Sequence, residues 1–141
     1  APDRVILGYP VISLEEESNP GSVENLLGPD SSPQQRRDLS PNHLVTSVHP
    51  PTFVWHTADD AAVPLSNALR YTAALAAADV PVDLHVFARG VHGLGLANDE
   101  RVAPEDDAPE WTGLCARWLQ RAGWVSGVVE PNPVTNPRFQ A

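Results

Sequence analysis

The chain has 141 residues, of which 42% are hydrophobic, and a formal net charge of −9 with arginine as its only basic residue apart from histidine. This length suits a single globular domain, and the acidic balance argues against a nucleic-acid partner or an anionic membrane surface. No apolar run reaches the roughly 18 residues of a membrane span and no signal peptide is visible. With a single cysteine as well, the sequence favours a cytoplasmic protein that uses neither membrane nor nucleic acid.

The first predicted element is a strand over residues 4–13, RVILGYPVIS, which is almost continuously apolar and β-branched. Such a run is typical of a strand covered on both faces in a parallel sheet. Residues 14–50 then form an irregular excursion with two short helical candidates, SVENLLG and PQQRRDL. Because long irregular segments between strands usually have a function, we expect this one to act as a cap over a site.

The next three elements form a strand, helix and strand unit. Residues 52–56, TFVWH, read as a second buried strand, and residues 82–87, VDLHVF, alternate in the manner of a strand near a sheet edge. Between them, apolar and small side chains recur at helical spacing at Leu65, Leu69, Thr72, Leu75 and Ala76, and Pro81 prevents continuation. Parallel strands require such a crossover, which is almost always right-handed.

A last helix is predicted over residues 109–122, followed by a glycine cap at Gly123 and a proline-rich extended tail over 125–141. Its apolar face contains Trp111, Leu114, Cys115, Trp118, Leu119 and Ala122. The spacing therefore predicts that Cys115 is a buried small hydrophobic residue. Together these elements predict an α/β fold with a small parallel sheet of about three strands.

Four motifs follow one another in a specific order: LGYPVIS, SVENLLG, the run from PPTFVWHTADD to GVHGLGL, and WLQRAGW. This series resembles the C-terminal half of an α/β-hydrolase of the acetyl-xylan-esterase-like type, and it covers residues 3 to about 124. The resemblance implies that residues 1–124 form a truncated α/β-hydrolase domain, with crossover and C-terminal helices packed on the sheet. It also implies a hydrolase that acts on small-molecule esters.

The resemblance assigns two catalytic candidates. The family carries an aspartate in a D-x-x-V-P context and a histidine in a G-x-H-G context, which Asp60 and His92 match, whereas Asp59 is one residue too far from the V-P pair. Both follow neighbouring strands, so we expect them at one sheet edge, where the carboxylate would accept the imidazole Nδ1 proton and leave Nε2 free as a base. The alternatives are that Asp60 caps the helix beginning near Leu65 and that His92 is a turn residue between glycines.

The nucleophile of that family is absent from this sequence. It is a serine in a G-x-S-x-G turn and works with an H-G-G-G-like oxyanion loop, but no serine here has both flanking glycines. We therefore expect that the chain alone is not a serine esterase. Two alternatives follow, namely that a separate N-terminal partner supplies the serine to this Asp and His, or that the chain is a non-catalytic, self-associating remnant.

A third hypothesis, the one we favour from the sequence for the isolated chain, replaces the serine by a metal ion. Imidazole and carboxylate groups bind zinc, and a catalytic site needs about three of them and an open position for water. His56 lies four residues before Asp60, so His56, Asp60 and His92 are the predicted zinc ligands, and the bound water would hydrolyse an ester or phosphoester. The competing interpretations are a backbone-bonded strand-end residue for His56, a solvated strand residue for His85, and either surface or ligand roles for His43 and His49.

The first strand also predicts a partner. In the family its outer edge pairs with a strand from the half of the fold that does not match here, and an unpaired apolar edge favours association. We therefore predict a homo-oligomer, most simply a twofold dimer.

Overall fold

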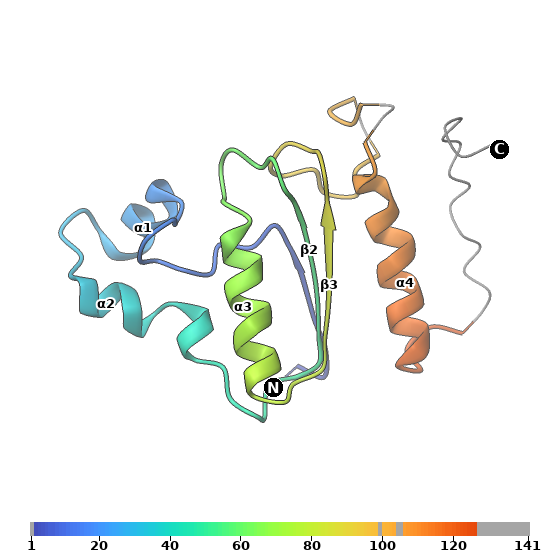
Figure 1. Cartoon of the computed structure of the whole chain (residues 1–141), viewed down its shortest axis with the longest axis horizontal. Coiled ribbons are helices and arrows are strands. Elements are labelled where there is room, and N and C mark those ends of the chain that lie inside the picture. Colours follow the sequence, from blue (N-terminus) through green and yellow to red (C-terminus); the bar gives the residue numbers. More distant parts are fainter. Residues whose placement is uncertain (1, 99, 104–105, 127–141) are drawn as a thin grey trace.

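The protein is described here by a computed structural model that covers residues 2–98, 100–103 and 106–126. In these residues, a parallel sheet contains β1 (Val5–Gly8), β2 (Thr52–Thr57) and β3 (Val82–Phe87), in the order β1-β2-β3. Helix α3 (Ser66–Ala77) packs on one face of the sheet and α4 (Trp111–Arg121) on the other (Figure 1). The predicted α/β fold with a small three-stranded parallel sheet is confirmed.

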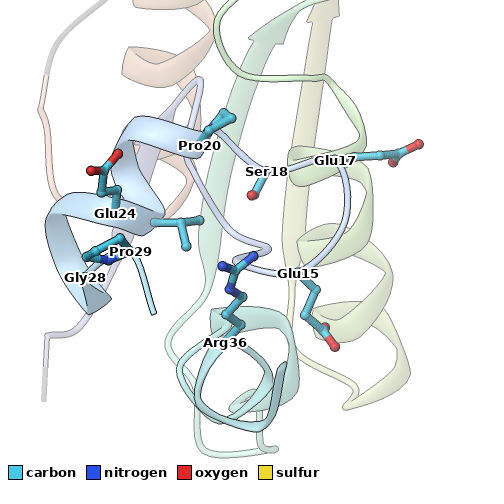
Figure 2. A pocket seen from close by; sticks show the side chains of 9 residues that line it. Glu15, Glu17, Ser18, Pro20, Glu24, Gly28, Pro29 and Arg36 are labelled. Atoms are coloured by element: carbon cyan, nitrogen blue, oxygen red, sulfur yellow. The ribbon is translucent and has the colours of Figure 1, made fainter. Parts of the chain in front are cut away.

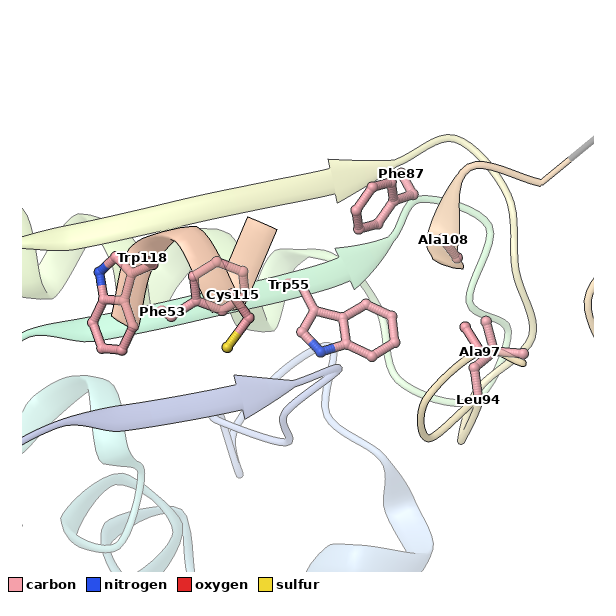
Figure 3. Packing of buried hydrophobic residues seen from close by; sticks show 8 residues of the cluster. All are labelled: Phe53, Trp55, Phe87, Leu94, Ala97, Ala108, Cys115 and Trp118. Carbon is pink, nitrogen blue, oxygen red and sulfur yellow. The ribbon is translucent and has the colours of Figure 1, made fainter. Parts of the chain in front are cut away.

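Strand β2 is the centre of the molecule because every one of its six residues is buried. Its side chains alternate between two hydrophobic clusters, as the period of a strand requires. Phe53 and Trp55 point toward α4, where they pack with Cys115 and Trp118 (Figure 3), and Val54 packs against α3 on the opposite face. The prediction of a strand covered on both faces is confirmed for β2, and Cys115 is the buried hydrophobic residue that its spacing predicted.

Strand β1 is shorter and less covered than predicted. It ends at Gly8 rather than at residue 13, because Tyr9 takes a left-handed backbone with φ of 40° and Pro10 has no N–H to donate. Ile6 is 44% exposed, so the strand is not covered on both faces. Within the described residues β1 pairs only with β2, and β3 likewise lies at an edge, as the alternation in its sequence predicted.

The helix ends follow the local sequence. Helix α4 stops where Gly123 adopts φ of 76°, and the N–H groups of Gly123 and Trp124 bond to the carbonyls of Gln120 and Leu119. This is the predicted glycine cap. Of the predicted extended tail, residues 127–141 lie outside the described part of the chain. No helix in the part described is long and apolar enough to cross a membrane.

The excursion over residues 14–50 contains α1 (Pro20–Leu27) and α2 (Pro33–Asp38), close to the two predicted short helices. Hydrogen bonds attach the excursion, and the residues just before it, to the N-terminal part of the crossover at Ala62 and Asn67. Asn19 caps α1 through Oδ1 and donates from Nδ2 to the carbonyl of Ala62, and the buried Asn67 accepts from the N–H groups of Ile12 and Ser13. These bonds hold the excursion against α3 and against the loop after β2.

Candidate active site

The structure brings Asp60 and His92 into direct contact at the carboxyl edge of the sheet. Asp60 follows β2 and His92 follows β3, and Oδ2 of the acid lies 2.8 Å from Nδ1 of the imidazole. The Asp60 side chain is fully buried, whereas that of His92 is 36% exposed. The alternative in which Asp60 caps the helix is wrong, because α3 is preceded by Leu65 and has no side-chain cap.

The Asp60 carboxylate is held in its ionised form by the loop that carries it. Oδ1 accepts hydrogen bonds of 2.9 Å from the N–H groups of both Ala62 and Val63. Burial alone would raise the pKa of Asp60, but these N–H groups and the bond from His92 outweigh it and hold that pKa below its ordinary value. An ionised acceptor fixes the tautomer of His92, so the proton lies on Nδ1 and Nε2 presents a lone pair.

Tyr9 supports the imidazole from the side and was not identified from the sequence. Its ring packs edge-on against that of His92 with centroids 4.8 Å apart, and edge-on against Trp55 at 4.9 Å. Its hydroxyl accepts a hydrogen bond from the N–H of Gly95 in the loop that follows His92. The left-handed turn at Tyr9 thus places an aromatic ring beside the imidazole of His92. In the sequence, only the G-Y-P motif could have indicated a turn there.

His56 lies next to Asp60, and its Nε2 is occupied by a hydrogen bond to the backbone. Nε2 lies 2.9 Å from the carbonyl of Val63 and 3.5 Å from Oδ2 of Asp60. A carbonyl can only accept, so Nε2 carries the proton and has no lone pair for a metal ion. Burial lowers the pKa of His56, against smaller opposing effects of Val63 and Asp60, and keeps the ring neutral. Nδ1 is buried without a hydrogen-bond partner in the described residues.

The described residues therefore present no preassembled set of ligands for the predicted zinc ion. Although His56, Asp60 and His92 share one rim, their facing atoms already bond to one another or to the backbone. In residues 2–98, 100–103 and 106–126, no group of three or more His, Cys, Asp or Glu side chains has a geometry that could hold a metal ion. The backbone-bonded interpretation of His56 is the one that the geometry supports.

The remaining histidines lie in other parts of the molecule. Nε2 of His43 pairs with Glu15 at 2.6 Å, and Nδ1 of His49 accepts from the N–H of Thr46. His85, predicted to be a solvated strand residue, is half-buried. Its ring packs on Phe53 with centroids 4.9 Å apart, and burial under α4 lowers its pKa.

Two hollows on the molecule differ in their relation to the candidate site. A hollow of about 400 Å³ opens beside His92 and is bordered by Asp59, Arg89 and Arg101. A second hollow of about 480 Å³ lies within the excursion, between α1 and α2, with the Arg36 guanidinium projecting into it (Figure 2). Of these two hollows, only the first is lined by His92.

The buried, neutral His56 makes the stability of the fold pH-dependent. As the pH falls below 6.5, the ordinary pKa of histidine, His56 binds a proton in the unfolded chain but not in the folded one. The free energy of unfolding therefore decreases. We expect His56→Gln to flatten this decrease, because glutamine retains an N–H donor for Val63 but does not titrate. Urea unfolding at about pH 7.5 and about pH 5.5 measures the slope.

The matched variant for that experiment is His56→Asn. Its shorter amide cannot reach the Val63 carbonyl and leaves a buried acceptor unpaired, at a cost of about 1–3 kcal/mol relative to His56→Gln. An unchanged pH slope in His56→Gln, or an asparagine variant as stable as the glutamine one, would contradict this role of Nε2.

Comparison with known proteins places this geometry in a family. A model of the prolyl oligopeptidase family matches residues 14–119. An endo-1,4-beta-xylanase B from Butyrivibrio fibrisolvens is 39% identical over 99 residues, which are 70% of this chain and 16% of that protein.

Two solved structures of hydrolases also match most of this chain. The chain superposes on the acetyl ester-xyloside bifunctional hydrolase of Caldicellulosiruptor lactoaceticus with a TM-score of 0.82 and 44% identity, covering 89% of this chain and 44% of that one. It superposes on a carboxylesterase of Lactobacillus plantarum with a TM-score of 0.73 and 35% identity, covering 91% and 47% of the two chains. The chain therefore spans less than half the length of the relatives it matches.

Proposed function

Since the chain belongs to the prolyl oligopeptidase family and carries part of an α/β-hydrolase fold, we propose that it supplies the acid and the base of a serine ester hydrolase. Asp60 is the acid and His92 the base. The nucleophilic serine comes from residues other than these 141, either in the same polypeptide or in a second chain. The observation that carries the proposal is the 2.8 Å bond between Oδ2 of Asp60 and Nδ1 of His92.

The chemistry follows from where the proton of His92 lies. With Nδ1 donating to Asp60, Nε2 takes the proton of a serine hydroxyl as its oxygen attacks the ester carbonyl. The imidazolium then gives that proton to the departing alcohol, which leaves an acyl-serine. Nε2 then takes a proton from water as the water oxygen attacks the acyl group. The imidazolium returns this proton to the serine oxygen, which releases the carboxylic acid and restores the serine. Throughout, the Asp60 carboxylate stabilises the positive charge on the ring.

Two observations support a serine from elsewhere. Every serine of the sequence lies in the described residues, yet none forms a hydrogen bond with His92. None stands in the G-x-S-x-G turn that exposes a nucleophile in this fold. The substrate class is argued from the relatives, since one is named for acetyl ester and xyloside hydrolysis and another is a carboxylesterase. We propose a small carboxylic ester, with the acyl group held in the hollow beside His92.

The test is a fusion enzyme in which this chain replaces the part of the Caldicellulosiruptor hydrolase that it matches. At 44% identity the two share enough sequence for the sheet to be completed. We expect the fusion enzyme to hydrolyse p-nitrophenyl acetate and the 141-residue chain alone to be inactive. Loss of activity on substituting Asp60 or His92 supports the proposal, and a soluble, folded but inactive fusion enzyme contradicts it.

The same assay decides the metal hypothesis. Hydrolysis of an ester or phosphotriester by the 141-residue chain alone, lost after chelation and restored by zinc, would establish the metal-activated route in place of the serine route. Hydrolysis that requires the fusion and survives thorough chelation would support the serine route.

We also infer that the 141-residue chain self-associates when it is alone. The outer edge of β1 has no partner strand in the described residues, and the half-exposed Ile6 stands on that strand. Unpaired N–H and C=O groups on a flat apolar edge favour pairing with a second copy. Light scattering at micromolar concentration is expected to give the mass of a dimer or larger, and a sharp monomer peak would contradict the inference.

A further inference from the structure

Two side chains that shortly precede the candidate acid in the sequence hold the loop that carries the candidate base. The hydroxyl of Thr57, the last residue of β2, donates to the carbonyl of Gly90 at 2.7 Å. The carboxylate of Asp59 accepts from the N–H of the same glycine at 2.8 Å. Both backbone polar groups of Gly90 are therefore bound by the end of β2 and the loop that follows it, and Gly90 stands two residues before His92.

We call Thr57, Asp59 and Gly90 the clamp. Both the backbone conformation and the surroundings of Gly90 favour a glycine there. Gly90 has φ of 145°, and a Cβ atom there would lie 2.8 Å from Cγ2 of Thr57 and 2.9 Å from Cδ1 of Leu94. A larger residue would therefore fit only if the side chains of Thr57 and Leu94 moved. The close contact and the two hydrogen bonds thus fix the distance between the backbone segments that carry Asp60 and His92.

We propose that Thr57 and Asp59 are positioning residues for the Asp60–His92 pair. The inference rests on the proposed function, in which that pair is the acid and base. Thr57 and Asp59 act on the pair through Gly90, because in the described residues neither side chain bonds to the imidazole or to Asp60. Displacements of about 1 Å in such geometry cost on the order of 100-fold in rate, so a rigid link between the two loops matters to catalysis.

The role predicts a specific pattern of variants. Asp59→Ala removes the acceptor and frees the Gly90 N–H, whereas Asp59→Asn retains an acceptor oxygen in the same place. Thr57→Val removes the hydroxyl at nearly constant volume, whereas Thr57→Ser retains it. If Thr57 and Asp59 position the pair, Asp59→Ala and Thr57→Val weaken the bond between Asp60 and His92 and lower activity. Asp59→Asn and Thr57→Ser then preserve both. If the charge of Asp59 were needed instead, asparagine would fail along with alanine.

The most direct readout is proton NMR of the 141-residue chain. A hydrogen bond between an imidazole Nδ1–H and a buried carboxylate gives a far-downfield proton signal, which requires neither serine nor substrate. We expect the signal in the wild type, Asp59→Asn and Thr57→Ser, and its loss or broadening in Asp59→Ala and Thr57→Val while the amide spectrum stays that of a folded protein. In the fusion enzyme, kcat of the two harmful variants should fall about 10- to 100-fold with KM nearly unchanged.

The outcomes separate this inference from the proposed function. An unchanged downfield signal in folded Asp59→Ala and Thr57→Val would overturn the positioning role while leaving the acid and base assignment intact. A downfield signal that depends on the clamp, in a fusion enzyme whose hydrolysis does not need His92, would uphold positioning and overturn the proposed function. Loss of the signal in Asp59→Asn as well would also overturn the inference, since the acceptor oxygen is still present.

Discussion

Replacing His92 by alanine in the fusion enzyme is expected to lower kcat for p-nitrophenyl acetate by about 10⁶-fold. The serine hydroxyl would then have no base, because Nε2 of His92 is the only group that the Asp60 bond prepares to receive its proton. Any residual rate would come from substrate binding and from oxyanion donors that this chain does not contribute. Steady-state kinetics with active-site titration measures the change.

The control is His49→Ala, which removes an imidazole whose Nδ1 bonds only locally, to Thr46. This variant should keep the kcat of the parent fusion enzyme. A His92→Ala variant that retains more than about one hundredth of the parent kcat would be incompatible with a base whose removal costs about 10⁶-fold.

Replacing Asp60 by asparagine is expected to lower kcat by about 10⁴-fold with the fold intact. The two backbone N–H groups that bind Oδ1 of Asp60 would orient the amide oxygen, so its NH₂ group would face Nδ1 of His92. A donor in that position stabilises the wrong tautomer, with the proton on Nε2, and the ring can no longer act as a base. The substitution also removes the carboxylate charge that stabilises the imidazolium.

The matched substitution is Asp38→Asn, which changes an exposed carboxylate on α2 that bonds only to Gln34. It should leave kcat and KM unchanged. The circular dichroism and thermal unfolding of Asp60→Asn test whether the loss is catalytic. If folded Asp60→Asn turned over within about tenfold of the parent, the carboxylate would not be the acid of a triad.

Much of the fold could be predicted because its signals are local. The continuous apolar run of β2 and the helical spacing before Pro81 each specify an element without reference to distant residues. The meeting of Asp60 and His92 could be predicted as well, since consecutive parallel strands place their carboxyl ends at one edge. That expectation required only the order of elements and two motifs.

Other features could not be predicted because they depend on contacts between distant residues. The end of β1 is set by a left-handed Tyr9, and this side chain reaches a histidine more than eighty positions later. The hydrogen bond of His56 depends on where the loop brings the Val63 carbonyl, which decides that Nε2 is a donor rather than a metal ligand. The spacing of Asp59 argues against an acid, and its bond to Gly90 depends on how the fold brings the two loops together.

Fluorophosphonates react with a serine only when a base activates it, so labelling of the fusion enzyme with such a probe tests directly whether His92 activates a serine from outside this chain. If Asp60 and His92 serve a nucleophile from outside this chain, mass spectrometry will find a single modified serine in the portion contributed by the Caldicellulosiruptor hydrolase. His92→Ala will then slow its modification by orders of magnitude. Modification of a serine within the 141 residues, or a labelling rate that is the same with and without His92, would contradict the account.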